Sequence, residues 1–393
     1  MNYILFDDNN RAQLFPFTLS RPVCEIRAGI LTLKQKWEKH LGLQCAYHTV
    51  GYLESKYPSL SQENIDNTCI YINGAVFPTE ELIYQLKNLQ PNTALVKDDK
   101  IIAVACNSYH TTFNPNSHGF DISQCFTSIQ TLEKPWEIFA LNGKNIQEDY
   151  DLITKNRISA AIDASNQVIH PENIFIEEGA TVLCSILNAS TGPIYIGKDA
   201  EVMEGSMIRG PFALCEHSAL KMGAKIYGPT TIGPHSKVGG EINNSVIFGY
   251  SNKAHDGFLG NSVIGEWCNL GADTNNSNLK NNYGQVKIWN ISAKDWQATG
   301  LQFCGLLMGD HSKAGINTMF NTGTVTGFCA NIFDGGFPPK YIPSFSWGGH
   351  KNAPKFELEK AIEVATKVFE RRGLNFTNGD KEIFEHLYLN CEL

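Results

Sequence analysis

The sequence lacks the features that would mark a membrane, nucleic-acid-binding or disulfide-rich protein. It has no run of 18 apolar residues, so no membrane span is expected. Its 32 lysines and arginines are outnumbered by 40 aspartates and glutamates, and a net charge of −8 provides no general basic field for nucleic acid. The eleven cysteines include no C-x-x-C pair, which argues against a zinc or disulfide framework.

The amino-terminal residues also lack the basic region and apolar core of a signal peptide. Together with unpaired cysteines, this predicts a cytoplasmic protein with reduced thiols. A chain of 393 residues exceeds what one hydrophobic core usually organises. We predict an α/β domain with a helical connector over residues 1–165, a repeat domain over 166–350 and a helical tail over 351–393.

The first region alternates strand-like and helix-like segments. Short strands are predicted at 3–6, 45–50, 69–72 and 101–105, and Ile30, Leu33, Trp37 and Leu41 form one face of a helix. This alternation predicts a Rossmann-like α/β domain with a mostly parallel sheet. In such sheets, ligands bind beyond the carboxyl ends of the strands. Residues 131–165 are predicted to be a helical connection.

The second region repeats with a period of six residues. Eight successive hexads begin with an aliphatic residue, which has odds on the order of 10⁻⁴ if about a third of residues are aliphatic by chance. The fifth position is mostly small, and glycines at 197, 233 and 239 suit tight turns. The pattern predicts a left-handed parallel β-helix with three strands per coil, against the usual right-handed rule. The aliphatic residues are Ile196, Val202, Ile208, Leu214, Leu220, Ile226, Ile232 and Val238.

The pattern is interrupted and then ends in a tail. Residues 273–282 are polar and break the hexad rule, so they are expected to form a loop that projects toward a neighbouring subunit. Leu358, Ala361, Ile362, Ala365 and Phe369 form one apolar face of a closing helix, with Gly373 as its stop. Three histidines, His217, His235 and His311, occupy the fourth position of their hexads and are predicted to face solvent at a corner. His311 is the exception to watch, because its coil could also contribute to a ligand pocket.

The segment from Lys253 to Gly265, KAHDGFLGNSVIG, resembles the acetyltransferase half of GlmU, the bifunctional enzyme that makes UDP-N-acetylglucosamine. His255 takes the position of the family's catalytic histidine, and Phe258 takes that of its tyrosine. An imidazole near neutrality suits proton removal from an amine that attacks a thioester. The resemblance implies that Asn269 and Asn278 bind the sugar.

The same resemblance implies acetyl-CoA as co-substrate. Ala272 would lie near its thioester, and Gly309, Asp310 and Gly327 belong to the coils expected to form the donor pocket. The family's Arg and Lys for the sugar phosphate are absent, since Tyr227 and Asn243-Asn244 stand there; Lys225 or Lys253 could substitute. Because one prism supplies only part of an acyl-CoA cleft, a homotrimer is expected.

The first region is similar, more loosely, to sugar-1-phosphate nucleotidyltransferases. The segment LFPFTLSRP at 14–22 fits their signature, and Arg21 could pair with a phosphate. The acids and asparagines at 7–10 replace the glycines that cradle phosphates, and Gln13 replaces an arginine. Asn73-Gly74 matches the family's Asn-Gly-Asp, but the Mg²⁺ ligand position is Ala75.

Three functions follow as hypotheses. The first is a bifunctional enzyme that joins an NTP to a sugar 1-phosphate, of the UDP-N-acetylglucosamine or dTDP-glucose type, and N-acetylates an amino sugar phosphate. The second is an acetyltransferase alone with a degenerate first domain. The third is a non-catalytic trimeric scaffold. The first also predicts that Arg21→Ala affects nucleotidyl transfer only, because its two sites should lie in separate domains.

Overall fold

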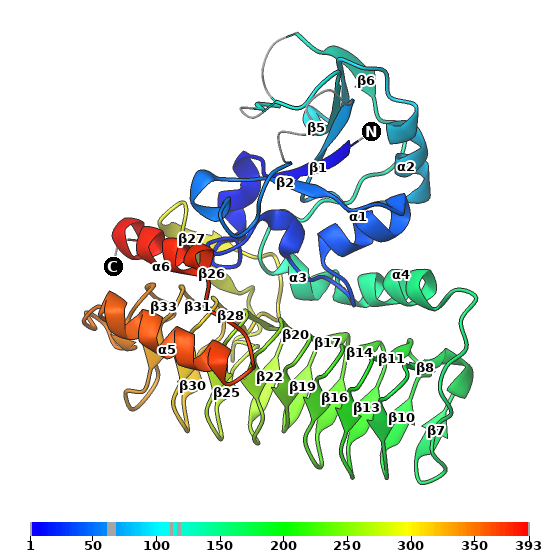
Figure 1. Ribbon diagram of the computed structural model, residues 1–393. Coiled ribbons are helices and arrows are strands. Elements are labelled where there is room, and N and C mark those ends of the chain that lie inside the picture. Colours follow the sequence, from blue (N-terminus) through cyan, green and yellow to red (C-terminus); the bar gives the residue numbers. More distant parts are fainter. Residues whose placement is uncertain (1, 61–67, 111–112, 116–118, 392–393) are drawn as a thin grey trace.

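The computed structural model describes residues 2–60, 68–110, 113–115 and 119–391. The amino-terminal domain sits above a long β-helix, with the tail helices beside one end of it (Figure 1). Within these residues, no helix is long and apolar enough to cross a membrane.

The amino-terminal domain is built on a six-stranded sheet. In spatial order the strands are β2 (Ala46–His48), β1 (Asn2–Phe6), β3 (Cys69–Asn73), β5 (Lys100–Cys106), β4 (Thr93–Lys97) and β6 (Asp121–Gln124). The pairings β1–β2, β1–β3 and β4–β6 are parallel. The predicted strands are therefore present, but the sheet is mixed, because β5 pairs antiparallel with both β3 and β4.

Helices flank this sheet and lead to the next region. Helix α1 (Leu33–Leu41) begins with a capping box, in which Thr32 and Gln35 exchange hydrogen bonds, and it buries Leu33 and Trp37 as predicted. Helix α2 (Glu80–Lys87) follows β3. The connector forms α3 (Glu137–Ala140) and α4 (Asn142–Thr154). Short 3₁₀ turns occupy Asn9–Leu14, Val23–Glu25, Gly51–Leu53 and Pro171–Asn173.

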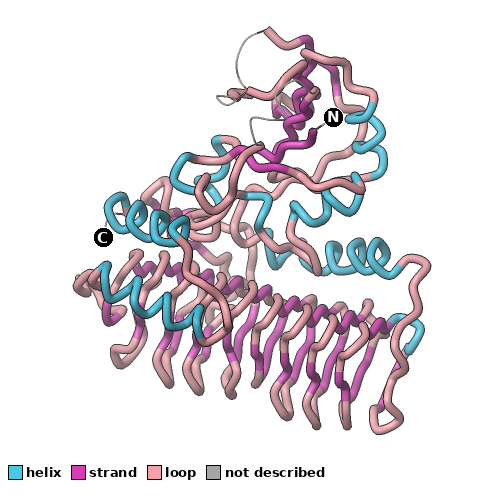
Figure 2. The backbone as a smooth tube through the Cα atoms, viewed as in Figure 1, coloured by secondary structure: helices cyan, strands magenta, loops and turns pink. Residues whose placement is uncertain are grey.

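The β-helix has three faces, each of which is a parallel β-sheet, and the coils are stacked along its length (Figure 2). The predicted fold class is confirmed. All eight predicted aliphatic positions point into the prism and are buried. The β7 face contains β7 (Gln167–Ile169), β10 (Ile186–Asn188), β13 (Met207–Arg209), β16 (Lys225–Tyr227), β19 (Glu241–Asn243) and β22 (Phe258–Gly260).

The other two faces are longer. The β8 face contains β8 (Ile174–Ile176), β11 (Ile194–Ile196), β14 (Phe212–Leu214), β17 (Thr230–Ile232), β20 (Val246–Ile247), β23 (Val263–Ile264), β28 (Leu306–Met308), β31 (Thr324–Thr326) and β33 (Tyr341–Ile342). The β9 face contains β9 (Thr181–Val182), β12 (Glu201–Val202), β15 (Ala219–Leu220), β18 (Lys237–Val238), β21 (Asn252–Lys253), β24 (Asn269–Leu270), β29 (Lys313–Ala314), β32 (Asn331–Ile332) and β34 (Trp347–Gly348).

The amino-terminal domain covers the β8 face and shares a core with it. Leu14, Phe17 and Val23 of the domain pack in one apolar cluster with Val246 and Leu307 of the β-helix. An inserted hairpin, β26 (Lys287–Asn290) and β27 (Asp295–Ala298), adds a polar contact, since Asn290 Nδ2 donates to Gln13 Oε1 at 3.0 Å. The two regions are therefore one packed unit.

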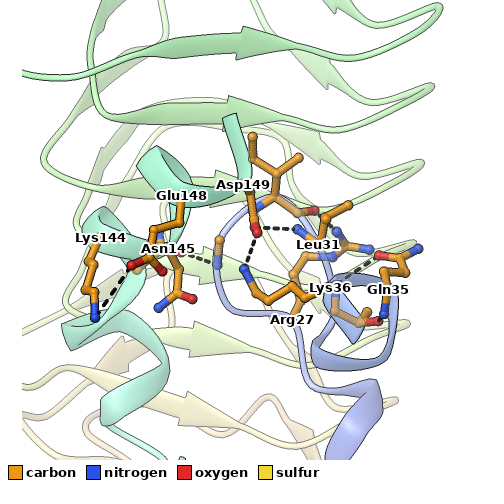
Figure 3. Close-up of polar contacts among 12 residues, drawn as sticks. Arg27, Leu31, Gln35, Lys36, Lys144, Asn145, Glu148 and Asp149 are labelled. Carbon is orange, nitrogen blue, oxygen red and sulfur yellow. Dashed lines mark hydrogen bonds and ion pairs between the residues drawn. The ribbon is translucent and has the colours of Figure 1, made fainter. Parts of the chain in front are cut away.

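A buried acid fastens the connector to the amino-terminal domain (Figure 3). Asp149 of α4 forms an ion pair with Lys36, and its Oδ2 accepts hydrogen bonds from the Ile30 and Leu31 backbones at 2.8 and 3.0 Å. Gly29 has φ of +91°, and a Cβ there would lie 2.4 Å from Asp149 Oδ2. The loop can approach Asp149 only because this residue is glycine.

The tail forms two helices, α5 (Leu358–Glu370) and α6 (Asn378–Asn390), where one was predicted. They cover a corner of the β-helix along which aromatic rings stack, among them Tyr250 on Trp267 at 4.3 Å and Trp267 on Phe369 at 4.0 Å. His217 is exposed as predicted, but His311 is buried against Trp267 and Phe384. The solvent-facing prediction is wrong for His311 because the tail helices cover its corner.

Candidate active site on the β-helix

His255 lies on the turn that carries the chain from β21 on the β9 face to β22 on the β7 face. Its side chain is exposed, and the half-buried Phe258 opens the following strand. Gly257 has φ of +118°, and a Cβ there would approach Thr274 O to 2.3 Å. The tight turn therefore needs glycine two residues after the histidine, and it presents the imidazole to solvent.

Lys253 holds this turn from inside the prism. It occupies an interior position, in register with Val238, and only 1% of it is exposed. Its Nζ donates to the carbonyl oxygens of Gly239, His255 and Asp256. All three ammonium protons are therefore used within the chain, so the predicted substrate-binding role of Lys253 is not supported by its position.

Burial lowers the pKa of the Lys253 ammonium to about 8, with Asp256 and Asp273 opposing the shift. Between pH 8 and the ordinary lysine value, the unfolded chain binds more protons than the folded one, so stability should rise with pH in that window. We compare the free energy of unfolding of wild type with that of Lys253→Met, which lacks the titrating group. The difference, wild type minus variant, should increase by about 2–3 kcal/mol from pH 8 to pH 10.5. Urea unfolding of both proteins across this range measures it; a difference that stays flat would contradict the expectation.

Asn269 lies beside this turn on a basic hollow of the β9 face. The hollow lies between the strands β18, β21, β24 and β29 and the end of α5, and Ala254, the residue before His255, lines it. Asn269 is exposed on β24, and Ala272 is half-buried at the corner after that strand. Asn269, predicted to contact the sugar, and Ala272, predicted to lie near the thioester, thus share one side of the β-helix with His255.

Four cationic residues of the hollow were not predicted. They are Lys237, Lys313, Arg371 and Arg372. The hexad register could have indicated the two lysines, because each precedes an interior residue, Val238 or Ala314, and so points outward. Nothing in the sequence indicates that the arginines lie here, since only the packing of α5 brings them to the strands.

Asn278 is held by a hydrogen bond within the chain, and the first part of the predicted loop, residues 273–278, does not project. Its Nδ2 donates to Asn261 Oδ1 at 2.8 Å. The preceding residues form β25 (Asn275–Asn276), which pairs with β30 (Met319–Phe320), and Asn276 Oδ1 accepts from Gly260 N at 2.9 Å. Asparagine side chains here replace the missing strand hydrogen bonds of the prism, so residues 273–278 continue the β-helix.

Arg21 contacts the β-helix. It is buried, and its guanidinium pairs with Asp310, which also accepts from Ser20 Oγ, and with Glu266 at 3.3 Å. Its Cζ lies 5.0 Å from the centre of the Phe248 ring. Burial alone would lower the pKa of Arg21, but the Asp310 and Glu266 carboxylates outweigh it and raise the pKa. A phosphate would have to displace these partners.

This pairing bears on the predicted roles of both residues. Arg21 is predicted to bind a substrate and Asp310 a cofactor, and in the structure they bind each other across the domain junction. Gly309 and Gly327 are buried there too, and a Cβ on Gly309 would meet Pro16 at 3.0 Å, so neither glycine is among the residues that line the basic hollow. The expectation that Arg21→Ala affects nucleotidyl transfer only assumes that Arg21 lies apart from the β-helix. Its ion pairs with Asp310 and Glu266 contradict that assumption, and substitutions at residues in contact are generally not independent in their effects.

The nucleotidyltransferase-like site does not fit Mg²⁺. Asp7 accepts from Val23 N at 2.8 Å and from Thr49 Oγ1 at 2.6 Å, and it pairs with Arg11. Asp8 Oδ2 accepts from Asn73 Nδ2 at 2.8 Å, and Ala75 offers no side-chain oxygen. In the described part of the chain, no three His, Cys, Asp or Glu residues are placed to hold a metal.

Comparison with known proteins confirms the predicted resemblance to GlmU-like proteins. Residues 3–158 match the family model for sugar nucleotidyl transferases. A bifunctional sugar-1-phosphate nucleotidylyltransferase/acetyltransferase from Sulfurisphaera tokodaii is 30% identical over 146 residues, which cover 37% of this chain and 36% of that protein. Bifunctional protein GlmU from Methanococcus maripaludis is 28% identical over 210 residues, 53% of this chain and 44% of that protein.

The chain thus spans less than half the length of these relatives. Among solved structures, a UDP-N-acetylglucosamine acyltransferase from Campylobacter jejuni matches 59% of this chain and 97% of its own, at 13% identity and a TM-score of 0.22. At this score the two chains do not superpose as wholes.

Proposed function

We propose that this protein is a transferase of sugar-nucleotide biosynthesis whose β-helix moves an acetyl group from acetyl-CoA to an amino sugar phosphate. The observation that carries the proposal is the exposed His255 on a braced turn next to Asn269 and a basic hollow. The GlmU-like relatives support the choice of acceptor class.

The chemistry assigned to the site is direct transfer. The acceptor amine attacks the thioester carbonyl, a C–N bond forms, and the C–S bond breaks as CoA thiolate leaves. His255 takes the proton that the attacking nitrogen loses, and that proton can then pass to the departing thiolate. The Lys253 contacts would keep the imidazole in place during this step, and Asn269, with its amide facing outward, would orient the sugar.

A second candidate activity is nucleotidyl transfer by the amino-terminal domain. The family match over residues 3–158 favours it, with an NTP and a sugar 1-phosphate as substrates. Two features weigh against it: Arg21 is buried, and Ala75 stands where a carboxylate would bind the metal. Pyrophosphate release with Mg²⁺ and a panel of NTPs and sugar 1-phosphates tests it; no release with any pair would leave this domain a structural or binding role.

Release of free CoA tests the acetyltransferase itself. We expect purified protein to release CoA from acetyl-CoA only when an amino sugar phosphate is present. No release with any acceptor, alongside an intact fold, would favour the trimeric scaffold over an enzyme.

We further propose a homotrimer, as predicted from the incomplete cleft. Supporting this, exposed apolar side chains line the β7 face, which the amino-terminal domain leaves open: Ile169, Ile186, Met207 and Tyr227. Subunits related by a threefold axis could bury such a strip.

Light scattering should therefore give the mass of about three chains. Met207→Glu should shift the protein toward monomers, because it places a charge on this strip, while Met222→Glu, at an exposed corner, should not. A wild-type monomer that is fully active would contradict both the trimer and a shared site.

A further inference from the structure

The basic hollow on the β9 face collects positive charge that the fold does not neutralise. Four of its eleven lining residues are lysine or arginine and none is acidic. In the described part of the chain, none of the four forms an ion pair. In a chain with a net charge of −8, such a cluster is not a product of overall composition.

The polar contacts of these cations are with neutral groups. Arg372 donates to Asn252 Oδ1 at 3.2 Å, and Lys313 Nζ donates to the His311 carbonyl oxygen at 2.9 Å. Burial lowers the pKa of Arg372, and the charge of Arg371 beside it acts in the same direction. Like charges held together in this way are relieved when an anion enters between them.

The cations are also fixed in place. Lys237, Asn252, Asn269 and Lys313 follow one another in strand register, so they form one outward row on the β9 face. Opposite them, Phe369 packs on Trp267 and anchors the last turn of α5, and Arg371 and Arg372 follow directly after the end of this helix. A ligand would therefore meet two preformed walls.

We propose that this hollow binds a phosphate ester of a substrate, using cations supplied by the carboxyl end of α5. The inference rests on the proposed acetyl transfer for its meaning, since Ala254 places the hollow next to His255. It also accounts for the missing Arg and Lys upstream of the histidine: the positive charge comes instead from the tail. Arginine suits this role because its planar guanidinium can bind phosphate oxygens bidentately.

Two phosphate esters are possible occupants, a sugar phosphate and the 3′-phosphate of the CoA nucleotide. Isothermal titration of the full-length protein separates them. One arm compares glucosamine 1-phosphate with glucosamine, and the other compares acetyl-CoA with its 3′-dephospho form. The hollow is assigned to whichever ligand loses affinity when its phosphate is removed.

The test variant is Arg371→Gln with Arg372→Gln. The matched control is Lys360→Gln with Lys367→Gln, which removes the same charge from exposed positions of the same helix. We expect the test pair to weaken binding of the phosphorylated ligand by about 10- to 100-fold and to reduce its salt dependence, with the unphosphorylated ligand unaffected. The control pair should bind like wild type.

Lys237→Gln, a single exposed strand substitution, is a second variant that should weaken the same ligand with little risk to the fold. Equal losses in test and control pairs, or no loss in either, would overturn the proposal. If phosphate binding depends on these arginines but CoA is never released, the phosphate site stands and the acetyltransferase proposal fails. If acetyl transfer occurs and the arginines do not affect binding, the acetyltransferase proposal stands and the phosphate site fails.

Discussion

Asp310→Ala should destabilise the protein by about 3–5 kcal/mol, because it leaves the buried Arg21 guanidinium without its main partner. Removing one member of a buried ion pair exposes the remaining charge to the full cost of desolvation. Ser20 also loses its acceptor. Since a typical domain is stable by only about 5–15 kcal/mol, this loss is large enough to lower the yield of folded protein.

Urea or thermal unfolding measures the effect. Asp334→Ala, which removes an exposed partner of His350, is the matched control and should change little. Arg21→Met combined with Asp310→Leu should recover much of the stability, because apolar side chains of similar volume remove both buried charges together. If Asp310→Ala unfolds like wild type, the pair does not hold the junction.

His255→Ala should lower acetyl transfer by about 10²- to 10⁴-fold, the usual consequence of losing a general base. The fold should be unaffected, since the side chain is exposed and the turn is held by Lys253 and Gly257. Steady-state release of CoA measures the loss, and the loss should appear in kcat.

His217→Ala provides the control, because His217 is also exposed at a corner of the β-helix but lies on an earlier coil. It should retain nearly full activity. A His255→Ala protein that turns over at close to the wild-type rate would remove this histidine from the mechanism, whatever the state of the basic hollow.

Arg21 makes a structural contact in the amino-terminal domain. In the sequence, Arg21 belongs to the segment that resembles the nucleotidyltransferase signature, and in the structure it joins this domain to the β-helix. A substitution at Arg21 should therefore alter stability and both proposed activities together. An activity assay of Arg21→Ala is informative only beside a stability measurement on the same protein.

The sequence by itself determined the β-helix and the position of His255. A period of six with aliphatic residues at one phase is a local property, because each hexad forms its own strand and turn, and all eight predicted interior positions are buried. The strands of the first domain and the apolar face of α5 follow from equally local patterns. Glycine at 257 likewise belongs to the turn that presents the histidine.

Only the tertiary structure decided which polar residues face a ligand and which hold the fold together. Arg21, Asp310 and Lys253 have the side chains of a binding site, but their partners lie on other coils or in another domain, and no local pattern names those partners. The tail helices buried His311 and brought Arg371 and Arg372 to the β9 face in the same way. The free energy of a buried charge depends on what surrounds it, and those surroundings come from chain segments that are distant in sequence.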